Sequence, residues 1–203
     1  MQDCYQLKYR TTPLDPDKLL IPFEIQTSWH VITGVPCSGK TTVIDMLAEQ
    51  GYKTVAEGAR AIFEEEFAKG RTLKEITKDA IALQNKIFEV QLELERNVNA
   101  GVVTFLDRAL PDSLSFHRVF GLNPNELLSE CLRYHYASVF ILERLPQSRE
   151  ATLGPEDAVT ADFLDEWLVR DYSALGYNVV RVPVLTPLER LEFVLDSVKQ
   201  FIN

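Results

Sequence analysis

Apolar residues are distributed along the chain in short runs that alternate with longer amphipathic stretches. The short runs are rich in β-branched and aromatic residues, as buried strands are, and they cover residues 29–33, 52–56, 102–106, 138–142 and 178–182. The longer stretches have apolar residues at helical spacing, and they cover residues 41–50, 58–69, 72–99, 114–120, 124–134, 161–175 and a closing segment that starts at Pro187. This alternation predicts an α/β fold with a parallel sheet covered by helices on both faces.

The first part of the chain does not follow this pattern. Pro13, Pro16 and Pro22 break any long helix there, and no periodicity is visible. The apolar stretch at residues 19–23 favours packing against the domain over disorder. We therefore predict an N-terminal extension over residues 1–27 and one α/β domain over residues 28–203.

The sequence Gly34-Val35-Pro36-Cys37-Ser38-Gly39-Lys40-Thr41 matches the phosphate-binding pattern G-x-x-x-x-G-K-[ST]. Glycines at this spacing allow several backbone N–H groups to point at one anion. Lys40 is expected to reach the β- and γ-phosphates, and the Thr41 hydroxyl is expected to ligate Mg²⁺. The residues predicted to bind the nucleotide are Gly34, Pro36, Cys37, Ser38, Gly39, Lys40, Thr41 and Thr42.

The flanks of this loop strengthen the prediction. An apolar run precedes it, and an amphipathic stretch that ends at Gly51 follows it, so the motif lies between a strand and a helix, as it requires. The helix N-terminus adds attraction for phosphate. No Asn-Lys-x-Asp guanine-reading motif is present, so we expect ATP as the nucleotide, with GTP as the alternative, together with Mg²⁺.

Asp107 and Arg108 directly follow the run 102–106. At the carboxyl end of a central strand, an aspartate can hold Mg²⁺ through water or accept the proton of an attacking hydroxyl. The planar fork of an arginine fits a second anionic group. The alternative is a surface ion pair or a helix cap. For Asp112, the N-cap of the next helix is the favoured role over catalysis.

Glu57 follows the run 52–56 and precedes Arg60 by three residues. If its strand neighbours the loop strand, Glu57 points into the same crevice and can act as a base or as an acceptor of substrate hydrogen bonds. The alternative is an acidic residue that simply favours a helix N-terminus.

Residues 143–160 are predicted to form a polar loop that contains Arg144, Arg149, Gly154 and Pro155. A mobile arginine in such a lid can neutralise charge on a migrating phosphoryl group. Arg149 is the preferred candidate because Arg144 lies too near the strand end to swing far. The alternative is a solvated surface loop.

The composition narrows the choice of partners. The chain has 203 residues, with 21 Lys and Arg against 30 Asp and Glu, a net charge of −9. That balance disfavours extended contact with nucleic acid or anionic membranes. No membrane-length apolar run or signal-peptide core is visible, so a cytoplasmic location is expected. Metal-type spacing is absent among the cysteines and histidines, which are Cys4, Cys37, Cys131, His30, His117 and His135.

Three further segments add a family resemblance to the phosphate loop. They are Ala56-Glu57-Gly58-Ala59-Arg60, the stretch Phe105 to Ser113 with Asp-Arg-Ala-Leu-Pro-Asp-Ser, and residues 176–190. Over about residues 29–200, the chain resembles the AAA-28-type P-loop ATPase/kinase-like family, related to the nicotinamide-riboside kinase domain and to thymidylate kinase. The resemblance implies a three-layer α/β/α fold with a five-stranded parallel sheet, and it likens Asp107 and Arg108 to the Asp-Arg pair of these kinases.

Two functions are compatible with these features. The first is an ATP- and Mg²⁺-dependent phosphotransferase for a small molecule such as a nucleoside, nucleotide or related metabolite, with Lys40, Asp107, Arg108, Glu57 and Arg149 as catalytic residues and Thr41 and Asp107 at the metal. The second is a nucleotide-dependent switch or slow NTPase that binds a protein or lipid, for which the extension and the helical segment 72–99 would be the contact regions. A homodimer is compatible with either.

Overall fold

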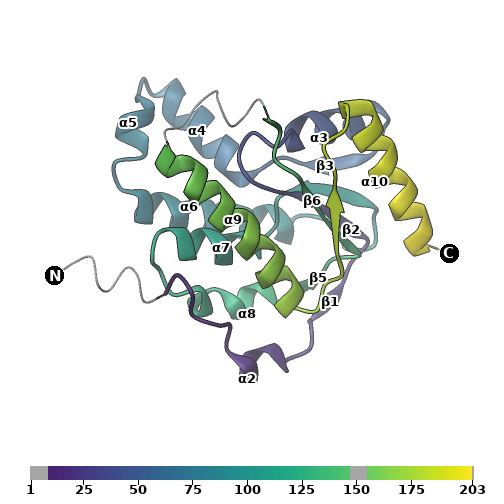
Figure 1. Cartoon of the computed structure of the whole chain (residues 1–203), viewed down its shortest axis with the longest axis horizontal. Coiled ribbons are helices and arrows are strands. Elements are labelled where there is room, and N and C mark those ends of the chain that lie inside the picture. Colours follow the sequence, from purple (N-terminus) through teal and green to yellow (C-terminus); the bar gives the residue numbers. More distant parts are fainter. Residues whose placement is uncertain (1–8, 147–154, 203) are drawn as a thin grey trace.

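A five-stranded parallel sheet forms the centre of the computed structural model, which describes residues 9–146 and 155–202 (Figure 1). In spatial order its strands are β3 (Lys53–Val55), β4 (Thr104–Asp107), β2 (Trp29–Thr33), β6 (Ser138–Leu142) and β7 (Val179–Val182). The order places β2 between β4 and β6, with Ile32 beside Asp107 on one side and Phe140 on the other. The carboxyl ends of β2 and β4 therefore lie next to each other, where ligands bind in such sheets.

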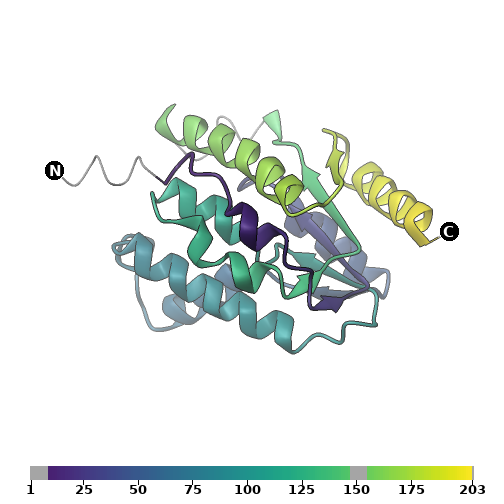
Figure 2. The ribbon, with the colours of Figure 1, turned by 90° about the horizontal axis from the view of Figure 1, so that it is seen from below.

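Helices cover both faces of this sheet, which confirms the predicted three-layer α/β/α fold (Figures 1 and 2). On one face lie α3 (Lys40–Glu49) and α10 (Pro187–Ile202). On the other face lie α6 (Ala80–Arg96), α7 (Asp112–Val119) and α9 (Pro155–Ala174), and α4 (Gly58–Ala68) packs on α6. None of the described helices is long and apolar enough to span a bilayer.

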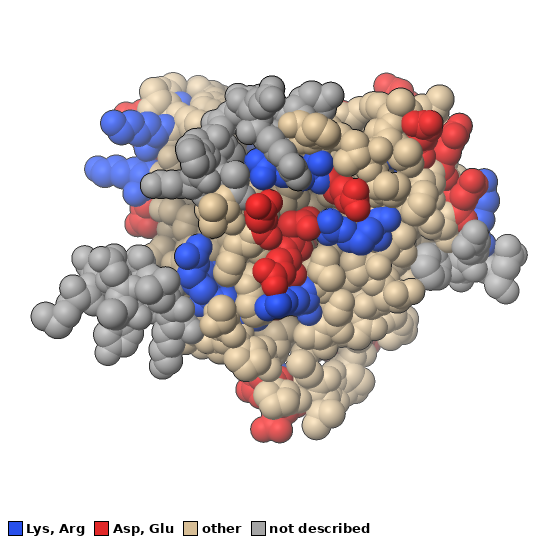
Figure 3. Space-filling model, viewed as in Figure 1, with Lys and Arg blue, Asp and Glu red and all other residues tan. Residues whose placement is uncertain are grey.

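The surface over α9 carries charges of both signs (Figure 3). Its carboxylates are paired with neighbouring arginines, in the pairs Arg144–Asp162 (3.7 Å), Arg181–Asp165 (2.9 Å) and Arg170–Glu166 (2.5 Å). The acidic and basic groups on the described part of this face thus largely offset each other.

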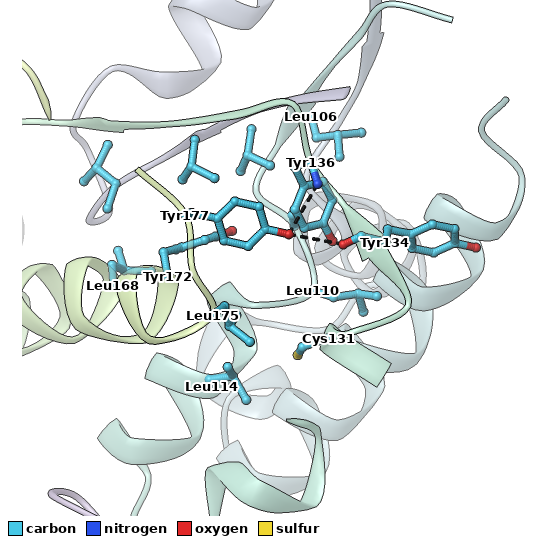
Figure 4. Close-up of a cluster of buried hydrophobic side chains, with 14 of the residues drawn as sticks. Leu106, Leu110, Leu114, Cys131, Tyr134, Tyr136, Leu168, Tyr172, Leu175 and Tyr177 are labelled. Carbon is cyan, nitrogen blue, oxygen red and sulfur yellow. Dashed lines mark hydrogen bonds between the residues drawn. The ribbon is translucent and has the colours of Figure 1, made fainter. Parts of the chain in front are cut away.

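Successive side chains of β2 point to opposite faces of the sheet and so contribute to two separate hydrophobic clusters. Trp29 and Val31 contribute to the larger cluster, beneath α7 and α9, whereas Ile32 contributes to the cluster beneath α3 and α10. The larger cluster contains several tyrosines, and Figure 4 shows the hydroxyl of one of them, Tyr177, hydrogen-bonded to two backbone groups. The Tyr177 hydroxyl donates to the carbonyl of Tyr134, 3.2 Å away, and accepts from the backbone N–H of Tyr136 at 3.3 Å. The Tyr177 hydroxyl can be buried without a large cost because it has both a donor and an acceptor as partners.

The described part of the N-terminal segment, residues 9–27, packs on the domain. It contains α2 (Pro16–Leu19) and β1 (Ile25–Gln26), and β1 pairs in parallel with β5 (Tyr134–His135). Leu14 is buried, and the backbone carbonyl of Thr12 accepts a hydrogen bond from Arg118. The favoured packing is thus observed for these residues, while a domain boundary at residue 27 stays a prediction.

The stretch 72–99 was predicted as one or two long helices, and the structure has two, α5 (Leu73–Ile76) and α6, of which α5 is short. A Thr72–Glu75 capping box starts the first, and the Asp79 side chain caps the second. Two other predicted segments differ from the structure. The stretch 124–134 contains only the short helices η1 (Pro124–Glu126) and α8 (Leu128–Cys131). The predicted loop 143–160 is wrong in its last part, because α9 already begins at Pro155; proline fits the first turn of a helix.

Candidate active site

The phosphate loop connects β2 to α3 and has the backbone that an anion-binding turn needs. Gly34, Cys37 and Gly39 have positive φ angles of 140°, 60° and 89°. A Cβ at Gly34 would lie 2.6 Å from the carbonyl oxygen of Leu142, so no larger residue fits there without a shift of the backbone. Cys37 adopts the left-handed conformation without being glycine, a strained geometry typical of functional loops.

Lys40 begins α3 and is buried against the loop. Its Nζ donates to the carbonyl of Val35 at 2.9 Å. Burial, together with the nearby positive charge of Arg108, lowers the pKa of Lys40 to about 8, although the carboxylates of Glu57 and Asp107 oppose the shift. An arriving phosphate would favour the charged ammonium, so the structure suits Lys40 to an anionic ligand.

Thr41 and Asp107 come together at the carboxyl ends of β2 and β4. The Thr41 hydroxyl donates to Asp107 Oδ2 at 3.2 Å and accepts from Arg60 Nη2 at 2.9 Å. Burial raises the pKa of Asp107. The second carboxylate oxygen, Asp107 Oδ1, and the Ser38 hydroxyl are buried and have no hydrogen-bond partner among the described residues.

These oxygens fit the expected Mg²⁺. Mg²⁺ prefers hard oxygen ligands and takes one or two from protein, the rest coming from phosphate and water. The described residues contain no cluster of three or more His, Cys, Asp or Glu side chains that could form a self-sufficient metal cage. A hydroxyl and a partly unsatisfied carboxylate beside the phosphate loop are therefore suited to a metal that arrives with a nucleotide.

Arg108 follows Asp107 in the chain, and several contacts fix its side chain in place. Its backbone is left-handed, with φ of 68°, and its side chain is buried. Nε donates to Glu57 Oε1 at 2.7 Å, and Nη1 donates to Asp112 Oδ1 at 2.9 Å. The guanidinium carbon lies 5.0 Å from the centre of the Phe116 ring. The structure thus brings Glu57 and Arg108 into direct contact, although 51 positions separate them in the chain.

Asp112 has a larger role than the predicted N-cap, which the structure shows to be wrong. Pro111 is the N-cap of α7, and Asp112 is the buried first residue of that helix. Its carboxylate accepts from Arg108, from the backbone N–H of Ala109 at 3.1 Å, from the hydroxyl of Tyr172 at 2.6 Å and from that of Thr33. Thr33 and Tyr172 were not predicted to belong to the site, because no sequence spacing links either to Asp112.

Gln91 and Glu95 lie one turn apart on α6 and hydrogen-bond to the backbone of the segment that carries Arg108. Gln91 accepts from the backbone N–H of Gly58 at 3.3 Å and donates to Glu95 at 2.9 Å. Glu95 also accepts from the backbone N–H of Leu110 at 2.9 Å and from the Tyr136 hydroxyl at 2.7 Å. Among the described residues no cation pairs with this carboxylate, and burial raises its pKa to about 7.

Glu95→Gln is expected to remove a pH dependence of stability. Because the folded pKa of Glu95 exceeds its ordinary value of 4.5, the carboxyl favours folding most at low pH, and this contribution disappears as pH rises through about 7. Linkage predicts that the wild type loses about 2 kcal/mol relative to the variant between pH 5.5 and pH 8. Urea unfolding of both proteins at the two pH values measures this, and parallel pH curves would contradict it.

A cavity of about 460 Å³ opens between the phosphate loop and helices α4, α6 and α7. We call it the acceptor chamber. Lys40, Thr41, Glu57 and Arg108 lie on its wall, and Gln84 and Gln91 add amide groups. Most of the remaining wall is apolar, with Phe63, Leu83, Ile87, Phe116 and Phe120. Apolar walls with a few convergent polar groups are typical of small-molecule sites.

The remaining predicted loop residues lie as follows. Pro36, Cys37 and Thr42 are exposed, and Ser38 is buried. Arg144 lies just after β6 and pairs with Asp162, 3.7 Å away. Arg149, the predicted lid residue, lies outside the described residues.

Arg190 supports the phosphate loop and was not predicted to do so. Its side chain is buried and donates to three backbone carbonyls, those of Ser38 (2.5 Å), Glu143 (3.0 Å) and Pro183 (3.0 Å). It therefore ties the loop to the ends of β6 and β7. In the sequence, Arg190 appeared only within the segment 176–190 that adds to the family resemblance, and its position in a helix does not distinguish a buried arginine from a solvated one.

Arg190→Met is expected to loosen the loop and destabilise the fold. The methionine keeps the apolar stem but leaves three carbonyls without their donor, which costs about 2–4 kcal/mol of unfolding free energy. Urea unfolding measures that loss, and nucleotide titration should show weaker binding. Arg170→Met is the control, since Arg170 is more than half exposed and makes a surface ion pair with Glu166 and a contact with the Trp167 ring, but no hydrogen bond to the loop among the described residues. Equal effects of the two changes would contradict the role of Arg190.

The loop, the adjacent Asp107 and the parallel sheet define a P-loop protein of the NTPase and kinase class. The chain belongs to the AAA domain family of type 28, whose match covers residues 29–190. The predicted family and fold are thereby confirmed. No curated protein matches the chain.

Solved structures of kinases share the fold. The NadR protein in complex with NR is 19% identical to this chain, with a TM-score of 0.62. The alignment covers 86% of this chain and 51% of the NadR chain, so this chain spans about half of the NadR length. Thymidylate kinase from Ehrlichia chaffeensis is 12% identical, with a TM-score of 0.60 and coverage of 88% and 100%. Deoxyadenosine kinase from M. mycoides is 14% identical, with a TM-score of 0.59 and coverage of 85% and 98%.

Proposed function

We propose that the protein is an ATP- and Mg²⁺-dependent phosphotransferase that acts on a small molecule such as a nucleoside, a nucleotide or a related metabolite. The observation that carries the proposal is the shared wall of the acceptor chamber. Lys40 and Thr41 of the phosphate loop face the same cavity as Glu57 and Arg108. An apolar chamber with a few polar groups, open to the phosphate end of the loop, is suited to a second, small-molecule substrate.

In this proposal, the loop amides and Lys40 hold the β- and γ-phosphates, and Thr41 and Asp107 hold Mg²⁺, which would neutralise phosphate charge. Arg60, in contact with Thr41, adds a second cation at that end of the site. Ser38 and Asp107 Oδ1 gain the partners that they lack among the described residues.

On the acceptor side, Glu57 accepts a hydrogen bond from the acceptor and takes its proton, while Arg108 binds an oxygen of the acceptor or of the transferring group. The acceptor oxygen then bonds to the γ-phosphorus as the bond between that phosphorus and the β–γ bridging oxygen breaks, and ADP leaves. Arg149 is the proposed lid residue, and GTP is the alternative donor. A cytoplasmic location and a homodimer stay predictions.

A screen of ATP against nucleosides, nucleotides and phosphorylated metabolites tests this function. Transfer of labelled phosphate to one acceptor class, above background hydrolysis and lost in Lys40→Ala, is the expected result. If every acceptor fails while ATP still binds the wild type and not Lys40→Ala, the phosphotransferase proposal is wrong. The nucleotide-switch hypothesis then predicts a partner whose affinity differs between the ADP- and ATP-bound forms.

A further inference from the structure

A second cleft lies beside the acceptor chamber. Its volume is about 1020 Å³, and it is lined by residues of α4, α5 and the start of α6, by the end of α7 and by Arg10 of the N-terminal segment. We call it the outer cleft. Ala80, Leu83 and Phe120 line both spaces and form the partition between them. A ligand that passes this apolar partition would occupy both the chamber and the cleft.

The acidic groups of the outer cleft are already used within the protein. Glu66 accepts from Lys69 at 3.0 Å and from Arg71 at 2.5 Å. Glu75 completes the capping box at the start of α5, and Asp79 caps α6. Their oxygens are therefore poorly placed to receive hydrogen bonds from a ligand.

Two cations of the cleft are not used in this way. Lys78 has no hydrogen bond or ion pair with any described residue. Arg10 stacks 4.8 Å from the centre of the Phe163 ring, but its Nε is buried and has no partner in the described part of the chain. Lys78 and Arg10 are thus cationic donors of the cleft that have no acidic partner among the described residues, and such donors favour an anionic ligand group.

We propose that the acceptor has two parts: a part in the chamber that carries the group to be phosphorylated, and an anionic group, such as a phosphate, that reaches the outer cleft and binds Lys78 and Arg10. This rests on the proposed phosphotransferase function and narrows its substrate class. The acceptor is a compound that already bears an anion remote from its reacting oxygen. The N-terminal segment, through Arg10, then contributes to acceptor selection.

Paired acceptors test the proposal. Initial rates are measured for nucleosides and for their 3′- and 5′-monophosphates with wild type, Lys78→Glu and Lys74→Glu. The wild type is expected to have a KM about tenfold lower for at least one monophosphate than for its nucleoside. Lys78→Glu should raise that KM about fivefold to tenfold, because attraction is replaced by repulsion, and should leave kcat and the nucleoside KM unchanged.

Lys74→Glu is the matched control. Lys74 is exposed on α5 and does not line the cleft, so its substitution by Glu makes the same change of charge outside the proposed site. Equal KM values within every pair, or the same effect for both variants, would overturn the proposal.

Calorimetric titration with the same monophosphates separates this proposal from the proposed function. Binding that persists in Lys40→Ala and is lost in Lys78→Glu supports the cleft even if no compound is phosphorylated. Absence of any monophosphate binding to the wild type overturns it, whatever the kinase screen shows.

Discussion

Lys40→Ala is expected to lower the rate of phosphoryl transfer about a hundred- to a thousandfold and to weaken ATP binding. The ammonium lies at the start of α3, pointed at the loop, where it bonds the carbonyl of Val35. Alanine removes the one long cationic side chain of the loop motif, so charge that develops on the phosphates loses a preorganised donor. A coupled assay for ADP release and calorimetric titration with a non-hydrolysable ATP analogue measure the two effects.

Lys53→Ala is the control for this change, because Lys53 is an exposed lysine on β3, away from the loop. It should keep wild-type activity. Comparable rates for Lys40→Ala and the wild type, at saturating ATP and acceptor, would contradict the assignment of the donor site.

Asp107→Asn is expected to lower kcat by about a hundred- to a thousandfold while the fold stays as stable as in the wild type or becomes more stable. The change removes a negative charge and keeps the shape of the side chain. Mg²⁺ bound there would then lose an ionised oxygen ligand, and its hold on the phosphates would weaken. Stability does not fall, because the Asp107 carboxylate is buried and its burial already disfavours the charged form, which raises its pKa.

The split between activity and stability is the informative result. Mg²⁺ titration of activity should show a raised requirement in Asp107→Asn, and urea unfolding should show no loss. Asp45→Asn, on the exposed side of α3, should change neither quantity. A variant that unfolds more easily and keeps its Mg²⁺ requirement would point to a purely structural role for Asp107.

Much of the fold could be predicted from local patterns. Buried strands are continuous apolar runs, so β2, β4 and β6 were visible in the sequence. The phosphate loop was visible because its function needs fixed spacing within eight neighbouring residues. Short elements were missed: β1 and β5 have two residues each, too few to show a period.

The helix boundaries show the limits of such patterns. The polar composition of residues 155–160 was interpreted as loop, yet α9 begins at Pro155. Polar residues are equally common on the outer face of a helix, so composition alone does not separate the two cases. The stretch 72–99 is divided into two helices because each has its own N-cap, Thr72 for α5 and Asp79 for α6.

The support of the site was even less visible. Arg190 contacts the carbonyl of Ser38 across 152 positions of sequence, and Tyr172 contacts Asp112 across 60. No local spacing encodes a contact of this kind, because it depends on how separate elements pack. Glu95 is a similar case. In the sequence it looks like any helix glutamate, and only the tertiary structure shows that it is buried, which makes its ionisation unfavourable.

The sequence by itself determined the class of fold, the phosphate loop and the two acidic positions at the strand ends, since these follow from local periodicity and from a motif with fixed spacing. Only the tertiary structure decided what surrounds them: the Glu57–Arg108–Asp112 contacts, the buried Arg190, the acceptor chamber and the outer cleft with Arg10 and Lys78. The physical reason is that burial, ion pairing and cavity shape arise from the strand order β3-β4-β2-β6-β7 and from helix packing, which join residues that are distant in the chain.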